Sequence, residues 1–142
     1  MTPESKKLAG VLLVIFPTVI IGGVSLLRFL IDPASGYMEN PLRQNLWRAG
    51  HAHAGVMLVL SLICLRYIDE AQLSSKLKWL VRAAVPSAAI FLPLAFFLSV
   101  LSPTATEPDG FIYLAFVGAI VLATGLVTLG VGLLRKKQSA SA

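Results

Sequence analysis

The only two histidines of this chain, His51 and His53, are its strongest candidates for chemistry. Residues two apart in an α-helix point about 200° away from each other, so both imidazoles cannot bind one metal ion from a regular helix. Met57 lies four residues after His53, and Ser61 and Cys64 continue the same helix face. This face carries an imidazole, a thioether, a hydroxyl and a thiol, a combination that suits copper, another transition metal or a haem iron.

His51 shares its own face with Trp47, Arg48 and Gly55. Arg48 and the histidines could also bind a lipid phosphate or the head group of a quinone. A different interpretation is that each histidine only hydrogen-bonds a carbonyl group or a lipid head group, and that Met57 packs in the core. We take as candidate metal ligands His53 and His51, and as candidate cofactor-binding residues His53, His51, Met57 and Arg48.

The segment that must position these residues is predicted to be one long helix. Asn40 is a good N-cap and Pro41 fits the first helical position. A helix from Pro41 to Tyr67 would be about 40 Å long, more than the roughly 30 Å of a bilayer's hydrocarbon layer. We therefore expect its first two turns to stand outside the membrane, and the histidines to lie in the outer third of the bilayer. Ionisable residues at that depth usually face the bundle interior, a partner or water.

Four long apolar blocks place the chain in the membrane class. Of 142 residues, 56% are apolar and 13% are charged, and a bilayer-spanning helix needs roughly 20 apolar residues in a row. We predict an all-α integral membrane protein, a single domain built as a bundle of four transmembrane helices. Arg82 should reach the head groups from one end of its span. The predicted spans are residues 8–31, 50–67, 80–101 and 111–134.

The distribution of Lys and Arg predicts the orientation in the membrane, because these residues concentrate on the cytoplasmic side. The two ends of the chain and the connection between the second and third spans hold most of them. We expect both termini in the cytoplasm, and the net charge of +5 to serve topology and lipid contact instead of nucleic-acid binding. The cytoplasmic set is Lys6, Lys7, Arg66, Lys76, Lys78, Arg82, Arg135, Lys136 and Lys137, and the outer set is Arg28, Arg43 and Arg48.

Prolines and glycines inside the spans predict how the helices bend and pack. Each proline removes one intrahelical hydrogen bond and kinks its helix. Gly118, Gly125 and Gly132 recur at seven-residue intervals, so one face of the fourth span can approach another helix closely, either in this chain or in a second copy. Gly22 and Gly23 offer a second surface of this kind. The prolines are Pro17 in the first span, and Pro86 and Pro93 in the third.

The run His53-Ala-Gly-Val-Met57, preceded by Arg48, resembles the H-G-x-x-M stretch of the second transmembrane helix in the catalytic subunit of haem–copper oxidases. In that family the histidine is an axial ligand of the low-spin haem, so the resemblance implies this role for His53 alone. The family's second axial histidine and its copper-binding histidines have no counterpart here, which excludes a dioxygen-reducing copper site. Residues 48–55 also resemble an R-x-G-H-x-H-x-G motif of small four-helix bacterial membrane proteins, which favours a bacterial inner membrane.

Three hypotheses follow. The first is a membrane protein, forming homo-oligomers, that binds haem or a transition metal near the outer face and takes part in electron transfer. The second is an accessory or assembly subunit of a larger membrane complex, without a cofactor. The third is an oligomeric small transporter or channel with protonatable histidines. Enzymatic catalysis is the weakest class, because the sequence has no G-x-S-x-G elbow, H-E-x-x-H motif or glycine-rich phosphate loop.

Overall fold

A computed structural model describes residues 1–136 of the chain; Lys137 and the tail 138–142 lie outside this part. Every regular element in it is helical, and four helical stretches are long and apolar enough to cross a membrane, which confirms the all-α prediction. Two turns of 3₁₀-helix, η1 (Pro33–Ser35) and η2 (Gly110–Ile112), lie in the connections. The helices are α1 (Pro3–Ile15), α2 (Pro17–Ile31), α3 (Pro41–Tyr67), α4 (Ser75–Leu98) and α5 (Tyr113–Leu134).

The long helix predicted around the histidines is present as α3. The side chain of Asn40 accepts a hydrogen bond from the Arg43 N–H at 3.1 Å, which satisfies one of the free amides at the start of the helix. Because α3 starts at Pro41 and not near residue 50, it extends about two turns beyond the apolar block. The third span is also longer at its start than the apolar pattern indicates, beginning at Ser75 with Ser74 as its cap.

Proline has different effects in the first and third spans. Pro17 divides the first span into α1 and α2, with Phe16 between them. In contrast, α4 continues through both Pro86 and Pro93 as one helix. The first span is therefore two consecutive helices within one stretch long enough to cross a membrane, and they divide where the sequence predicted a kink.

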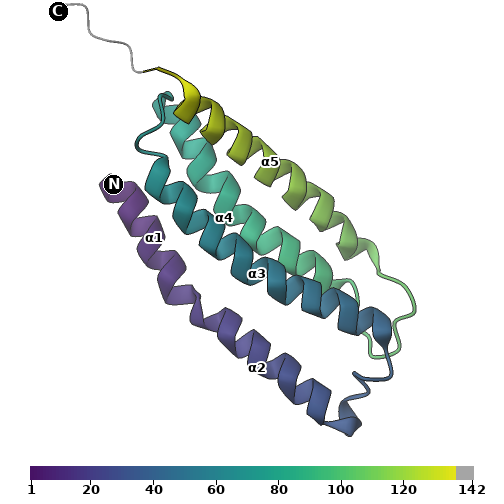
Figure 1. The fold of residues 1–142 in the computed structure, drawn as a ribbon. Coiled ribbons are helices and arrows are strands. Elements are labelled where there is room, and N and C mark those ends of the chain that lie inside the picture. The colour runs from purple at the N-terminus through teal and green to yellow at the C-terminus, as the bar shows by residue number, and fades with distance from the viewer. Residues whose placement is uncertain (137–142) are drawn as a thin grey trace, which may run out of the picture.

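The helices stand side by side (Figure 1), with α3 between the first span and α4. The fourth span, α5, packs mainly on α4, and the first span packs mainly on α3. The glycine face of α5 is turned towards α4: a Cβ added to Gly118 would meet Leu92 at 3.0 Å, and one added to Gly125 would meet Val85 at 3.0 Å. The close-packing partner of these glycines is thus within the same chain.

Connections at the two ends of the molecule are tied together by hydrogen bonds. At one end, the connection 68–74 contacts both the start of α1, through Thr2 and Asp69, and the end of α5, through a bond from the Gln72 N–H to the Gly132 carbonyl at 2.8 Å. At the other end, the amide of Asn40 donates to the carbonyls of Pro103 and Ala105. The start of α1 and the end of α5 consequently lie at the same end of the molecule (Figure 1).

Candidate functional site

The imidazole of His53 is held by the backbone of its own helix. Its Nδ1 lies 2.7 Å from the carbonyl oxygen of Ala49, one turn earlier. A carbonyl oxygen can only accept a hydrogen bond, so Nδ1 must carry the proton, and in the neutral ring Nε2 then keeps a free lone pair. A backbone carbonyl on one ring nitrogen is also the usual arrangement for a histidine whose other nitrogen binds a metal. His53 therefore has a fixed ring orientation and a free Nε2, which would suit a histidine that binds a metal.

The surroundings of His53 are apolar and partly open. Its ring centroid lies 5.0 Å from that of Phe96 on α4. A small hollow of about 140 Å³ is lined by Ala52, His53, Val56 and Met57. Met57 borders this hollow but is only 9% exposed and belongs to the apolar core, together with Leu58 and Ala88. Both His53 and Met57 thus line one hollow, although most of the Met57 side chain packs inside the protein.

His51 lies on a different side of α3, against the glycine pair of α2. A Cβ added to Gly23 would meet Cε1 and Nε2 of His51 at 3.0 Å, and one added to Gly22 would lie 3.7 Å from Nδ1. The absence of side chains at these two positions lets α2 approach the imidazole. His51 also lines an apolar groove of about 530 Å³ between the first span and α3, together with Phe16 and Val19.

The candidate residues do not form one site. His51 contacts the first span whereas His53 contacts α4, as the spacing of the two residues on a helix requires. Arg48 is exposed, and its Nη2 donates to the Gln44 side chain at 3.2 Å. Among residues 1–136, no group of three or more His, Cys, Asp or Glu side chains is placed to hold a metal ion. A site with three or more His, Cys, Asp or Glu ligands is therefore not formed by residues 1–136 of one chain.

Aromatic side chains and a buried arginine hold the start of α3 against its neighbours. Arg43 is only 6% exposed, donates from Nε to the Val100 carbonyl at 3.1 Å, and places its guanidinium 4.2 Å from the Trp47 ring centre. Trp47 donates from its indole nitrogen to the carbonyl of Phe97 at 3.2 Å and stacks on Tyr37. Arg43 thus ties the start of α3 to the carbonyls that follow α4.

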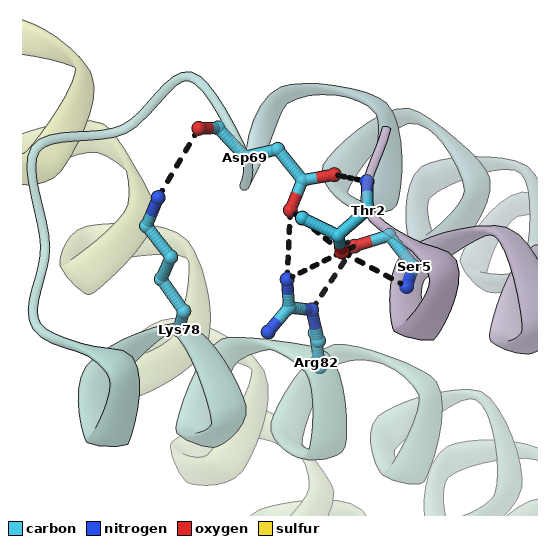
Figure 2. A network of polar contacts seen from close by, with 5 residues as sticks. All are labelled: Thr2, Ser5, Asp69, Lys78 and Arg82. Atoms are coloured by element: carbon cyan, nitrogen blue, oxygen red, sulfur yellow. Dashed lines mark hydrogen bonds and ion pairs between the residues drawn. The ribbon is translucent and has the colours of Figure 1, made fainter.

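A second polar cluster fixes the opposite end of the molecule (Figure 2). The carboxylate of Asp69 accepts from the Thr2 N–H at 2.7 Å, from the Ser5 hydroxyl at 3.2 Å and from Arg82 Nη2 at 2.7 Å. Arg82 also donates from Nε to Ser5 at 3.0 Å, and Lys78 donates to the Asp69 carbonyl at 3.1 Å. The expectation that Arg82 reaches the head groups is not met: its side chain is 6% exposed and paired with Asp69.

Two opposing effects act on the pKa of Asp69, which lies in the connection 68–74. Burial raises the pKa, while the hydrogen bonds from the Thr2 N–H, Arg82, Ser5 and the Thr2 hydroxyl lower it, and together they leave it below its ordinary value. The carboxylate is thus ionised at neutral pH and joins α1 to α4. Sequence inspection missed this cluster, although an acid beside several basic residues between two spans was a visible signal for it.

Comparison of this chain with protein-family models, with curated proteins and with solved structures finds no match.

Proposed function

We propose that this protein is a membrane haem protein in which Nε2 of His53 is an axial ligand of the iron, with a role in electron transfer. The observation that carries the proposal is the 2.7 Å contact between His53 Nδ1 and the Ala49 carbonyl. This contact fixes the tautomer and the orientation of the ring, so the ligand atom is prepared before the iron binds. The resemblance of residues 53–57 to an axial-ligand segment points to the same histidine.

The small number of ligands favours haem over a bare transition metal. Haem supplies four nitrogen ligands of its own and needs only one or two from the protein, whereas copper or zinc would need several side chains that residues 1–136 do not bring together. His51 cannot be the second axial ligand in the same chain, because it contacts α2 on another side of α3. Ligation by two histidines therefore requires a second copy of the chain, which would supply its own His53, and this makes a homo-oligomer part of the proposal.

The proposed location is the cell membrane of a bacterium, with both termini in the cytoplasm. Support comes from eight Lys and Arg residues among residues 1–136 at the end where α1 begins and α5 ends, against three near the other end. In this orientation α3 begins at the outer surface, and His53, twelve residues after Pro41, lies about 18 Å along the helix. The proposed haem would then be bound in the outer half of the bilayer.

A titration with haem tests this function. Protein purified in mild detergent is titrated with haem while the Soret band is followed, and a saturable red-shifted band is expected for the wild type. His53→Ala should abolish this band because it removes the ligand atom. His51→Ala is the matched control, since it removes an imidazole two residues away on another side of the same helix, and it should bind haem like the wild type.

Two outcomes contradict the proposal. If both variants bind haem as the wild type does, His53 is not the ligand. If the folded wild type binds no haem at all, the proposed function is wrong. Recovery of the chain with other membrane proteins in mild detergent would then favour an accessory subunit.

A further inference from the structure

The groove beside His51 contains a polar side chain that the proposed haem site does not use. It lies between the first span and α3, has a volume of about 530 Å³, and borders the hollow of His53, with which it shares Ala52 and Val56. Along α3 its wall runs from His51 to Ile63, about 18 Å at 1.5 Å per residue. The groove is thus long enough to hold an extended apolar chain.

One polar side chain stands among the residues that line this groove. His51 lies at one end, and all other lining residues are apolar or glycine. Within residues 1–136, His51 is partly exposed and makes no hydrogen bond through its ring nitrogens, whereas His53 is bonded to Ala49. A ligand of the groove would therefore meet one hydrogen-bonding group at its head and apolar surface along its tail.

The first span and α3 leave the groove open because small residues stand where larger ones would fill it. Gly55 lies one turn after His51, and a Cβ added there would reach the Val19 side chain at 3.7 Å. Val56, Val59 and Ile63 on the α3 wall are 59%, 45% and 48% exposed. The long side of the groove accordingly opens outward from apolar helices, towards the lipid in a membrane.

The charge around the groove favours a neutral head group. Neither Lys nor Arg lines the groove. The nearest guanidinium along α3 is that of Arg48, about one turn before His51, and it donates a hydrogen bond to the Gln44 side chain. A phospholipid would bring a phosphate that has no cation to meet it in the groove, and burying an unpaired charge is costly. A quinone brings uncharged carbonyl oxygens, which accept a hydrogen bond from an imidazole N–H, and an isoprenoid tail of apolar character.

We propose that the groove between the first span and α3 binds a membrane quinone, with the N–H of His51 donating to a head-group carbonyl and the tail lying along Gly55, Val59 and Ile63. This site uses the other histidine, and it borders the hollow of His53 through Ala52 and Val56. Binding at this position would place an electron-carrying molecule beside the proposed haem site.

Trp47 provides a probe for this site, because it lies one turn before His51 on the same helix. Replacing the other tryptophan, Trp79→Phe, leaves Trp47 as the single emitter. A short-chain benzoquinone is titrated into this variant in detergent, and the quenching of Trp47 fluorescence is corrected with protein-free micelles and free tryptophan. We expect saturable quenching, and an alkylbenzene with the same tail but no carbonyl should compete about tenfold more weakly, because it cannot accept the hydrogen bond from His51.

Three further variants in the Trp79→Phe background separate the possible outcomes. His51→Ala should weaken binding about tenfold, the effect of losing one well-placed hydrogen bond. Val59→Phe should also weaken binding by filling the groove while leaving His51 in place. Ile120→Ala, at an exposed position on α5 that does not line the groove, should leave the affinity unchanged. Quenching that is not saturable, or that is equal in the His51→Ala variant, would overturn the proposal, as would displacement of the quinone by a phospholipid.

Discussion

At the scale of single residues, three polar side chains are each held by a hydrogen bond to a carbonyl or carboxylate oxygen. His53 meets the carbonyl of Ala49, Arg43 meets that of Val100, and Arg82 meets the carboxylate of Asp69. His51 lies against Gly23 and has an apolar groove beside it. The two histidines therefore have different surroundings: Nδ1 of His53 is bonded to the backbone of its own helix, and the His51 ring borders α2 and the groove.

The Asp69 cluster gives a prediction of pH dependence. Because the pKa of Asp69 is lowered in the folded protein, the stabilisation is complete above the unfolded carboxyl pKa of about 3.9 and is lost as the pH falls through the folded value. Asp69→Asn should lower the free energy of unfolding by about 3 kcal/mol at neutral pH, since it leaves Arg82 buried without its ion pair. Unfolding in detergent, followed by circular dichroism from neutral to acidic pH, measures both effects.

Glu70→Gln is the matched control for this prediction. Glu70 pairs with Arg66 on the surface, where both side chains are more than half exposed, so the change should cost less than about 1 kcal/mol. Equal losses in the two variants would show that the Asp69 cluster is not the structural tie between α1 and α4.

Some of these residue environments could be predicted from the sequence and others could not. That His51 and His53 contact different helices follows from their two-residue spacing on α3. The burial of Arg43 does not, because its acceptors are more than fifty positions away, at the end of another helix. The same holds for Arg82: the sequence places it near the end of a span, but its contacts with Thr2 and Ser5 depend on where the fold brings the start of α1.

At the scale of the helices, α4 and α5 are joined by a glycine face. Gly125 is buried, and a Cβ added there would meet Val85 Cγ2 at 3.0 Å and Ala84 Cβ at 3.1 Å. Val85 is fully buried, so it has little room to move away. The seven-residue glycine interval predicted a close-packed face, but only the fold shows that its partner is α4 of the same chain.

Gly125→Ala tests this packing. We expect it to lower the free energy of unfolding by about 1–3 kcal/mol, the usual cost of overfilling a packed interface. Gly130→Ala is the control in the same helix, because a Cβ added there has no atom within 4 Å, and it should leave stability unchanged or slightly higher. Thermal unfolding in detergent compares the two variants, and a less stable Gly130→Ala protein would contradict the assigned face.

At the scale of the whole molecule, different polar contacts hold the helices together at the two ends. The end with the chain termini is joined by the Asp69 cluster, and the end with the connections 32–40 and 99–112 is joined by Arg43, Asn40 and the aromatic rings. The apolar blocks made the four spans predictable. The side-by-side order of the helices was not predictable, because it depends on side-chain contacts between spans.

The proposed orientation is tested by labelling single cysteines. Thr106→Cys is exposed in the connection 99–112, and Lys76→Cys is exposed near the other end; the native Cys64 is buried and provides the background. With both termini in the cytoplasm, a membrane-impermeant maleimide should label Thr106→Cys in intact cells, and Lys76→Cys only after the cells are permeabilised. The reverse pattern would mean that the histidines lie in the inner half of the bilayer.

The most direct test of the central claim is the visible absorption spectrum of the protein purified from haem-replete cells, taken together with elemental analysis for iron, copper and zinc. We expect a Soret band with stoichiometric iron in the wild type and in His51→Ala, and neither in a folded His53→Ala protein. A wild-type protein with no Soret band and no stoichiometric metal would contradict the assignment of His53 as a haem ligand.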